Sequence, residues 1–455
     1  MLEEIIKNTV KYKSSSSDKE QKTKGQFFTG IRTAEFMADL YTPNTRNIKV
    51  LDPGAGNGLL AAALVEKLIY VNKSDSIEIT FIENDPKIIP TLKKTANIIK
   101  KHCKDRVRCK ISIIQENFIL ADIKKGFDVV ICNPPYMKIR KDSPESKAMK
   151  DFVYGQPNLY ALFMAKAANL LQTDGAFIFI TPRSWASGNY FSVVRRYLAA
   201  NLSYKEIHIF NSRDKAFTTE AVLQETMIIS AIKNTLQHKT IHITASSDDS
   251  FATVTSFSVP SKSIKWVGQG EFLLIPENAS EAALIKEMSA IKSTFSSLGY
   301  IFKTGPVVEF RNRELLSREN TPDTVPMYRA LNIINESLVF PVNTSKAQYI
   351  KPAAKPLLIK NENTVFIRRL SAKENHRRIQ SCIYFKQGKE PFISAENHIN
   401  YLARKDGKPL TKKEVKWVQS LLSSDQYDTY FRILNGSTQV NASDLNNLPV
   451  RSLNQ

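Results

Sequence analysis

The chain of 455 residues is long enough for two domains that each bury a core of their own. Its 42% hydrophobic and 24% charged residues are ordinary for a globular protein, whereas its formal net charge of +20 is not. Solvated like-charged faces could account for this excess, but it favours a polyanionic partner, with nucleic acid ahead of an anionic membrane. Residues 301–455 hold 24 Lys and Arg against 14 Asp and Glu, so we expect the C-terminal part to contact the polyanion.

The composition also argues against other classes of protein. The four cysteines lack C-x-x-C spacing. A structural zinc site is therefore not expected, and the thiols are interpreted as reduced and intracellular. The sequence shows neither an apolar signal segment at its N-terminus nor an apolar run of about 18 residues. We expect a soluble, cytoplasmic protein without a membrane partner.

The N-terminal region is polar. Residues 1–24 are interpreted as an N-terminal arm that begins with a short helix. The stretch 25–30, Gly-Gln-Phe-Phe-Thr-Gly, places two glycines around an aromatic pair, which favours a loop that closes over a ligand.

Residues 48–68 predict a strand, a glycine-rich turn and a helix, the first unit of a Rossmann-like domain. Asp52 at the end of the strand favours a ligand with a cationic or hydroxyl-bearing end. The next predicted strand, 77–82, ends at Glu83, and a carboxylate in that place accepts the paired hydroxyls of a ribose. A third strand, 107–115, leads to Asn117 and Phe118, which offer an amide and an aromatic ring to an adenine.

A fourth strand is predicted over 128–132, where β-branched residues precede Asn133-Pro134-Pro135-Tyr136. Two consecutive prolines cannot continue a central strand, so a rigid turn follows at the edge where open α/β sheets bind their ligands. The Asn133 side chain and the Pro134 carbonyl are acceptors, and Tyr136 offers a flat face. This combination suits a planar ring with an exocyclic amine. A turn that merely ends a strand is the simpler interpretation.

Further helices and strands alternate up to residue 232, and Phe217 lies in a polar loop, 212–219. We predict a catalytic domain over 25–240, a Ser/Thr-rich linker over 241–270, and a second domain of mixed helix and strand over 271–455.

Four motifs occur in an order that resembles the gamma group of DNA adenine-N6 methyltransferases of type II restriction systems, which includes the TaqI methylase. They are Gly-Gln-Phe-Phe-Thr at 25–29, Asp-Pro-Gly-Ala-Gly at 52–56, Glu-Asn-Asp-Pro at 83–86 and Asn-Pro-Pro-Tyr at 133–136. Stretches at 304–311, 366–374 and 436–441 are similar to the PstI/BsuBI-type branch of that group. The resemblance covers residue 25 to about residue 450. It implies an α/β fold, with a Rossmann-like S-adenosylmethionine-dependent domain and a mixed α+β domain that recognises DNA.

The resemblance implies S-adenosyl-L-methionine as cofactor and an adenine flipped out of double-stranded DNA as substrate. A cognate restriction endonuclease that acts on the same site is a candidate partner, and the resemblance implies no direct contact with it. The catalytic residues would be Asn133, Pro134, Pro135 and Tyr136, and Tyr136 and Phe217 would stack on the target base. Cofactor contacts would come from Phe28, Thr29, Asp52, Pro53, Gly54, Ala55, Gly56, Gly58, Glu83, Asn117, Phe118 and Asn133. The candidates for contact with DNA are Arg311, Arg313, Arg368, Arg369, Lys373, Arg377 and Arg378.

The sequence departs from the family pattern at two positions. Asn117 stands where an Asp is common, so its amide oxygen would bind the amino group of the cofactor's adenine. Gly30 stands where a Pro is common, so that loop is expected to be more mobile.

Other functions use the same Asn-Pro-Pro-Tyr turn. It could hold an RNA guanine amine, a protein glutamine amide or the N4 amine of cytosine, because each presents a planar nitrogen. A catalytically inert DNA-binding protein with this fold is a further alternative. The basic C-terminal domain favours DNA over a glutamine substrate.

Overall fold

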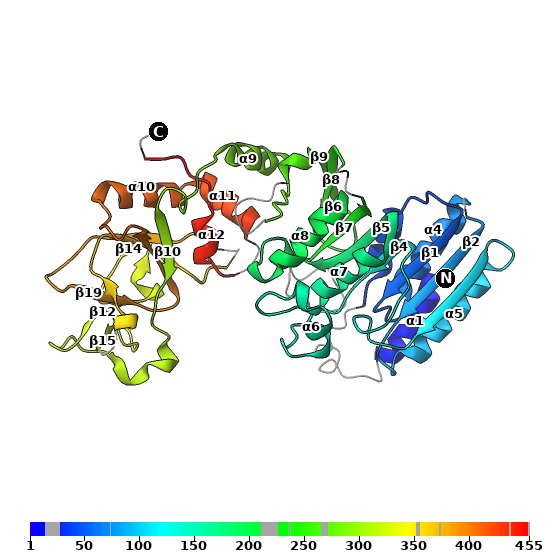
Figure 1. Ribbon diagram of the computed structural model, residues 1–455, viewed down its shortest axis with the longest axis horizontal. Helices are drawn as coiled ribbons and strands as arrows, with labels where there is room; N and C mark the ends of the chain where they lie inside the picture. Colours follow the sequence, from blue (N-terminus) through cyan, green and yellow to red (C-terminus); the bar gives the residue numbers. More distant parts are fainter. Residues whose placement is uncertain are drawn as a thin grey trace. The chain divides into compact units, whose positions relative to one another are not determined.

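The structure is a computed structural model, and the residues that it describes are 1–13, 28–72, 74–210, 226–234, 236, 238–264, 272–351, 355–372, 375–435 and 438–453. They form two compact units, of which the first ends at Ala279 and the second begins at Ser280 (Figure 1). Within these ranges, no helix combines the length and apolarity that a membrane crossing requires. No group of three or more His, Cys, Asp or Glu side chains in the same ranges could hold a metal ion.

A nine-stranded sheet forms the centre of the first unit (Figure 1), with the order β3-β2-β1-β4-β5-β7-β6-β8-β9. Strands β1 to β5 are parallel, whereas β7 is antiparallel to both β5 and β6. The sequence prediction of a Rossmann-like α/β domain is confirmed. The strands are β1 (Asn47–Pro53), β2 (Ser76–Ile82), β3 (Arg108–Ile114), β4 (Phe127–Cys132), β5 (Leu171–Pro182), β6 (Leu202–Phe210), β7 (Thr226–Lys233), β8 (Thr240–Ser246) and β9 (Val254–Pro260).

The helices of the first unit cover this sheet. Helix α4 is buried along Leu59 to Val65, because the sheet covers it on one side and α1, α3 and α5 contact it on others. Strand side chains alternate in direction, and those of Val50, Ile79 and Val129 share one core cluster with α4. The helices are α1 (Leu2–Lys13), α3 (Ile31–Asp39), α4 (Leu59–Val71), α5 (Ile89–Cys103), α6 (Pro144–Ala148), α7 (Leu159–Leu170) and α8 (Ser192–Asn201).

The predicted boundary at residue 240 and the linker over 241–270 are wrong. Strand β8 pairs in parallel with β6, and β9 pairs with β8, so both belong to the sheet. Residues 272–275 are buried, and the Ile275 carbonyl accepts a hydrogen bond of 2.7 Å from the Arg183 guanidinium, which holds this segment to the first unit. The Ser/Thr-rich composition reflects an edge strand, because most side chains of β9 are exposed.

The second unit is of mixed helix and strand, as predicted. One sheet has the order β10-β20-β17-β18 and is antiparallel throughout, and a second has the order β11-β15-β12-β19-β16. Its elements are α9 (Ala279–Ala290), β10 (Tyr300–Thr304), β11 (Leu316–Ser317), β12 (Val325–Tyr328), β13 (Ile333–Ile334), β14 (Ser337–Leu338), β15 (Tyr349–Ile350), β16 (Ile359–Lys360), β17 (Thr364–Arg368), β18 (Ser381–Tyr384), β19 (Phe392–Ala395), β20 (Ile399–Arg404), α10 (Lys412–Leu422), α11 (Asp425–Leu434) and α12 (Ala442–Asn446).

Candidate active site

A cavity of about 360 Å³ lies at the carboxyl ends of strands β1 to β4. Parallel strands bring residues at their ends to one edge of the sheet, which is why Asp52 and Asn133, 81 positions apart, meet here. All the predicted cofactor residues line this cavity except Pro53 and Gly58. The lining residues are Phe28, Thr29, Asp52, Gly54, Ala55, Gly56, Asn57, Leu59, Leu60, Ile82, Glu83, Asn84, Asp85, Pro86, Glu116, Asn117, Phe118, Asn133, Pro135, Met137, Leu159 and Phe163.

The glycine loop between β1 and α4 forms one wall. Gly54 and Gly56 have φ angles of 70° and 56°, which L side chains rarely adopt. A Cβ on Gly54 would lie 3.2 Å from the Phe163 ring. Gly58 has another role, because a Cβ there would lie 2.9 Å from Leu92. It allows α5 to pack closely and does not face the cavity.

Two buried carboxylates face the cavity from the ends of neighbouring strands. Glu83 accepts hydrogen bonds from the backbone N–H groups of Gly56 (2.9 Å) and Asp85 (2.8 Å). The Oδ2 atom of Asp52 is buried and has no hydrogen-bond partner among the described residues. Burial raises the pKa of the Asp52 carboxyl well above its usual range and also raises the pKa of Glu83. Together they suit a ligand that brings donors and positive charge.

Asn117 and Phe118 follow β3 on a tight turn. The Asn117 amide donates to Glu145 Oε1 (2.8 Å), and its oxygen accepts from the Ile119 N–H (3.0 Å). The oxygen that the sequence assigned to the cofactor's amino group is thus already engaged, and a second lone pair remains for a ligand. Phe118 packs against Phe163, with the ring centroids 4.8 Å apart.

The Asn-Pro-Pro-Tyr turn follows β4, which neighbours β1 in the sheet, so it meets the cavity beside the glycine loop. The Asn133 amide nitrogen donates to Thr29 Oγ1 (3.1 Å), so the amide oxygen faces away from Thr29. Pro135 lines the cavity, whereas Pro134 is buried outside the lining set. The Tyr136 hydroxyl donates to the Ile180 carbonyl of β5 (3.2 Å), which anchors the ring at its far end.

Sequence reasoning missed several lining residues. Asp85 lies inside the motif at 83–86 and Asn57 directly follows the motif at 52–56, so these motifs could have signalled both. Leu159 and Phe163 gave no signal, because α7 is apolar nearly all round, and Met137 just after the Asn-Pro-Pro-Tyr motif gave none either. Phe217 lies outside the described residues.

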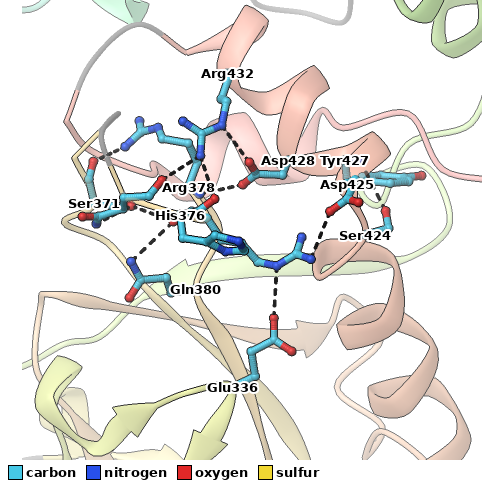
Figure 2. A network of polar contacts seen from close by, with 12 residues as sticks. Glu336, Ser371, His376, Arg378, Gln380, Ser424, Asp425, Tyr427, Asp428 and Arg432 are labelled. Atoms are coloured by element: carbon cyan, nitrogen blue, oxygen red, sulfur yellow. Dashed lines mark hydrogen bonds and ion pairs between the residues drawn. The ribbon is translucent and has the colours of Figure 1, made fainter.

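The predicted DNA contact of Arg378 is wrong. Its side chain is 0% exposed. Figure 2 shows Arg378, Asp428 and Arg432 in one polar network that joins α11 to residues 371–380. The Arg378 guanidinium donates to the Ser371 carbonyl, its backbone N–H donates to Asp428 Oδ1 (2.6 Å), and Arg432 donates to Asp428 Oδ2 (2.7 Å).

The other candidate cations that the structure describes either bond to groups of the second unit or are exposed. Arg368 donates to the carbonyls of Ala330 (2.9 Å) and Ile333 (2.8 Å), so it holds a turn. Arg377 forms ion pairs with Asp425 and Glu336, and Arg369 donates to the Asn397 carbonyl and Gln439. Arg311 and Arg313 are exposed, and the Arg311 guanidinium lies 5.4 Å from the centroid of the exposed Phe310 ring. Lys373 lies outside the described residues.

Comparison with known proteins identifies relatives that match 92% of the chain. A family model for the Eco57I restriction-modification methylase matches residues 63–217. The chain is 33% identical over 435 residues to the type II methyltransferase M.BsuBI of Bacillus subtilis, covering 92% of this chain and 86% of that protein. It is also 33% identical over 435 residues to the type II methyltransferase M.PstI of Providencia stuartii, covering 92% and 85%.

A solved structure shares the fold of both units. It is a nuclease-deletion mutant of the type ISP restriction-modification enzyme LlaGI in complex with a DNA substrate mimic. The TM-score is 0.51 at 12% identity, and the match covers 88% of this chain and 51% of that chain. With the cavity at the strand ends and identity to M.BsuBI along nearly its full length, the chain belongs to the type II methyltransferases of restriction-modification systems and is a DNA methyltransferase.

Proposed function

We propose that the protein transfers the methyl group of S-adenosylmethionine to the N6 amine of an adenine flipped out of duplex DNA. The observation that carries the proposal is the cavity itself, which the buried side chains of Asp52 and Glu83 and the Asn133 turn line together. The basic second unit and the net charge of +20 support DNA as the partner.

The methyl donor fits the polar groups of the cavity. Asp52 would hold its ammonium group, Glu83 its ribose hydroxyls, and Asn117 and Phe118 its adenine. The buried Oδ2 of Asp52 supports this fit, because a buried carboxylate oxygen needs a donor or a cation to offset its desolvation. When bound, the donor supplies a methyl group on a positively charged sulfur.

Asn133 and Pro134 would prepare the target amine. An adenine amine is a weak nucleophile, because its lone pair is delocalised into the ring. The Asn133 side-chain oxygen and the Pro134 carbonyl accept its two hydrogens, which favours a tetrahedral nitrogen with a localised lone pair. The new N–C bond forms as the methyl group leaves its sulfur, and the amine then loses a proton to solvent. A dedicated general base is not required.

Tyr136 would stack on the flipped base. Removing a base from the duplex costs a few kcal/mol, and stacking on an aromatic side chain returns roughly 1–3 kcal/mol. The hydroxyl of Tyr136 donates to the Ile180 carbonyl, which fixes the position of the ring whose face would stack on the base. Phe217 stays a predicted second stacking residue.

The test is to express the protein in a host without DNA methylation and to read modified bases directly by sequencing. We expect N6-methyladenine at one short motif at nearly complete occupancy. Asn133→Ala should abolish the signal, because one of the two acceptors is lost. Tyr136→Ala should lose far more activity than Tyr136→Phe, because stacking needs the ring.

Asn169→Ala is the matched control, since Asn169 is an exposed asparagine of the same unit that contacts Lys125. Methylcytosine at the motif would assign the chemistry to the N4 amine of cytosine. Unmodified DNA from a protein that binds the donor would point to the RNA or glutamine substrates, and a protein without methyl transfer to any of these would be an inert binding protein.

A further inference from the structure

Helix α1 contributes no residue to the cavity wall, yet its buried stripe is unusual. Leu2, Ile5, Thr9 and Tyr12 are spaced as one helical face, and all four are buried. The first two belong to the core cluster of α4 and α5. The last two carry hydroxyl groups where a purely structural helix would continue with apolar residues.

Thr9 is bonded to the glycine loop. Its Oγ1 donates to the Ile5 carbonyl (2.9 Å) and accepts from the Asn57 amide (2.8 Å). Asn57 lines the cavity, and its other groups are also fixed, because Oδ1 accepts from the Leu59 N–H (3.1 Å) and its carbonyl accepts from Thr95 (2.7 Å). Thr9 therefore completes the set of hydrogen bonds that fixes the position of Asn57.

Tyr12 contacts two other residues of the cavity wall. Its hydroxyl donates to Asp85 Oδ2 (3.4 Å), and its ring meets the Phe28 ring edge to face, with centroids 6.1 Å apart. Tyr12, Phe28 and Ile88 form a small buried cluster of their own. Phe28 lies over the glycine loop, since a Cβ on Gly56 would be 3.5 Å from its ring. Three wall residues from three parts of the chain thus depend on one face of α1.

We propose that Thr9 and Tyr12 are positioning residues for the methyl donor, which hold Asn57, Phe28 and Asp85 in place before the donor binds. This inference rests on the proposed function, because it takes the cavity to be the donor site. A preformed wall lowers the ordering cost of binding, so loss of these contacts should weaken donor affinity more than it slows methyl transfer.

The experiment measures S-adenosylmethionine and S-adenosylhomocysteine binding to the full-length protein by calorimetry, together with kcat and KM. Thr9→Val keeps the shape but removes the acceptor for the buried Asn57 amide, and we expect the donor Kd to rise about ten-fold. Thr9→Ser should return it to within about two-fold of wild type. Tyr12→Ala should also raise the donor Kd, and Tyr12→Phe less, because it keeps the ring against Phe28. At saturating donor, kcat should stay within about two-fold of wild type in each variant.

Ile5→Ala is the matched control. It lies on the same face of α1 and creates a cavity in the core, so it should lower the melting temperature at least as much as Thr9→Val. Its donor Kd should not change. An unchanged donor Kd in both Thr9→Val and Tyr12→Ala would overturn the proposal, and so would an equal rise in Ile5→Ala. A wild-type protein that binds neither ligand would instead contradict the proposed function.

Discussion

The two acids of the cavity are held differently, although each stands at the end of a strand. Glu83 receives two backbone hydrogen bonds, which fix its carboxylate before any ligand arrives. Asp52 lacks such a bond at Oδ2 within the described part of the chain, and burial raises its pKa. A positively charged ligand group beside Asp52 would restore the ionised form, so donor binding and the charge of this residue are coupled.

His208 on β6 is a buried residue that should make the stability of the fold depend on pH. Its ring nitrogens contact the hydroxyls of Thr244 (2.9 Å) and Ser246 (3.1 Å), and its ring packs against Phe36 and Phe251. Burial lowers the pKa of His208 to about 4. The folded protein therefore keeps this ring neutral over a range in which the unfolded chain takes up a proton.

We predict that stability falls as the pH drops below about 6.5, the unfolded pKa of histidine, and that this loss ends near the folded value. The full contribution is about 3 kcal/mol, because each pKa unit corresponds to about 1.4 kcal/mol. His208→Gln should lack this component. Denaturant unfolding of both proteins between pH 7 and pH 4 measures the difference, in which other titrating groups cancel. A difference that does not vary with pH would show that His208 is not kept neutral.

Individual site residues were predictable where a motif fixed both the residue type and its place at a strand end. Asp52, Glu83 and Asn133 are of this kind, since parallel strands bring such positions together whatever the details of packing. Arg378 was not, because its burial depends on Asp428 and on the Ser371 carbonyl, and contacts across 50 residues leave no local pattern. A run of basic residues has the same appearance in sequence whether it faces DNA or a carboxylate.

At the level of elements, the short 3₁₀ turn Glu309–Arg311 is a candidate contact surface for a polyanion in the second unit. Glu309 anchors the turn through Arg329, which is fully buried and also pairs with Glu396 (2.9 Å). Arg311 on this turn and Arg313 after it are exposed, whereas Arg368 holds a turn inside the unit.

We predict that Arg311→Gln and Arg313→Gln each weaken DNA binding and each lower the slope of log K against log salt by about 0.9, the value for one released counterion. Titration of a labelled duplex at several salt concentrations gives this slope. Arg46→Gln is the control, because Arg46 is exposed in the first unit and paired with Asp75. Slopes equal to wild type in both variants would show that this turn is not part of the DNA interface.

Most elements of the first unit were predictable, because glycine turns and apolar runs mark their ends. The strands β8 and β9 were not. A Ser/Thr-rich edge strand with exposed side chains resembles a linker in sequence, and its membership in the sheet is decided by backbone pairing to β6 and β8. The corrected boundary at Ala279 therefore sets where a fragment that contains the whole first unit should end.

For the whole molecule, we predict that a fragment ending at Ala279 unfolds cooperatively and binds S-adenosylmethionine. We expect it to lack methylation that is specific for one sequence motif. A fragment ending at residue 240 should be insoluble, because it loses β8 and β9 and leaves the edge of β6 unpaired. Solubility, calorimetry and sequencing of modified DNA compare the two fragments. Methylation confined to one motif by the longer fragment would place recognition in the first unit.

The position of the nine-stranded sheet along the chain has a consequence for synthesis on the ribosome. Every strand of that sheet and every lining residue of the cavity precedes Ala279, so the first unit is translated in full before the second begins. Domains tend to fold as they are made, from the N-terminus onward. Helix α1 precedes α4 and α5 in the chain and must wait for both, but the completed first unit need not wait for the second unit. A nascent protein can thus complete its cofactor cavity before the unit that we propose to recognise DNA has been made.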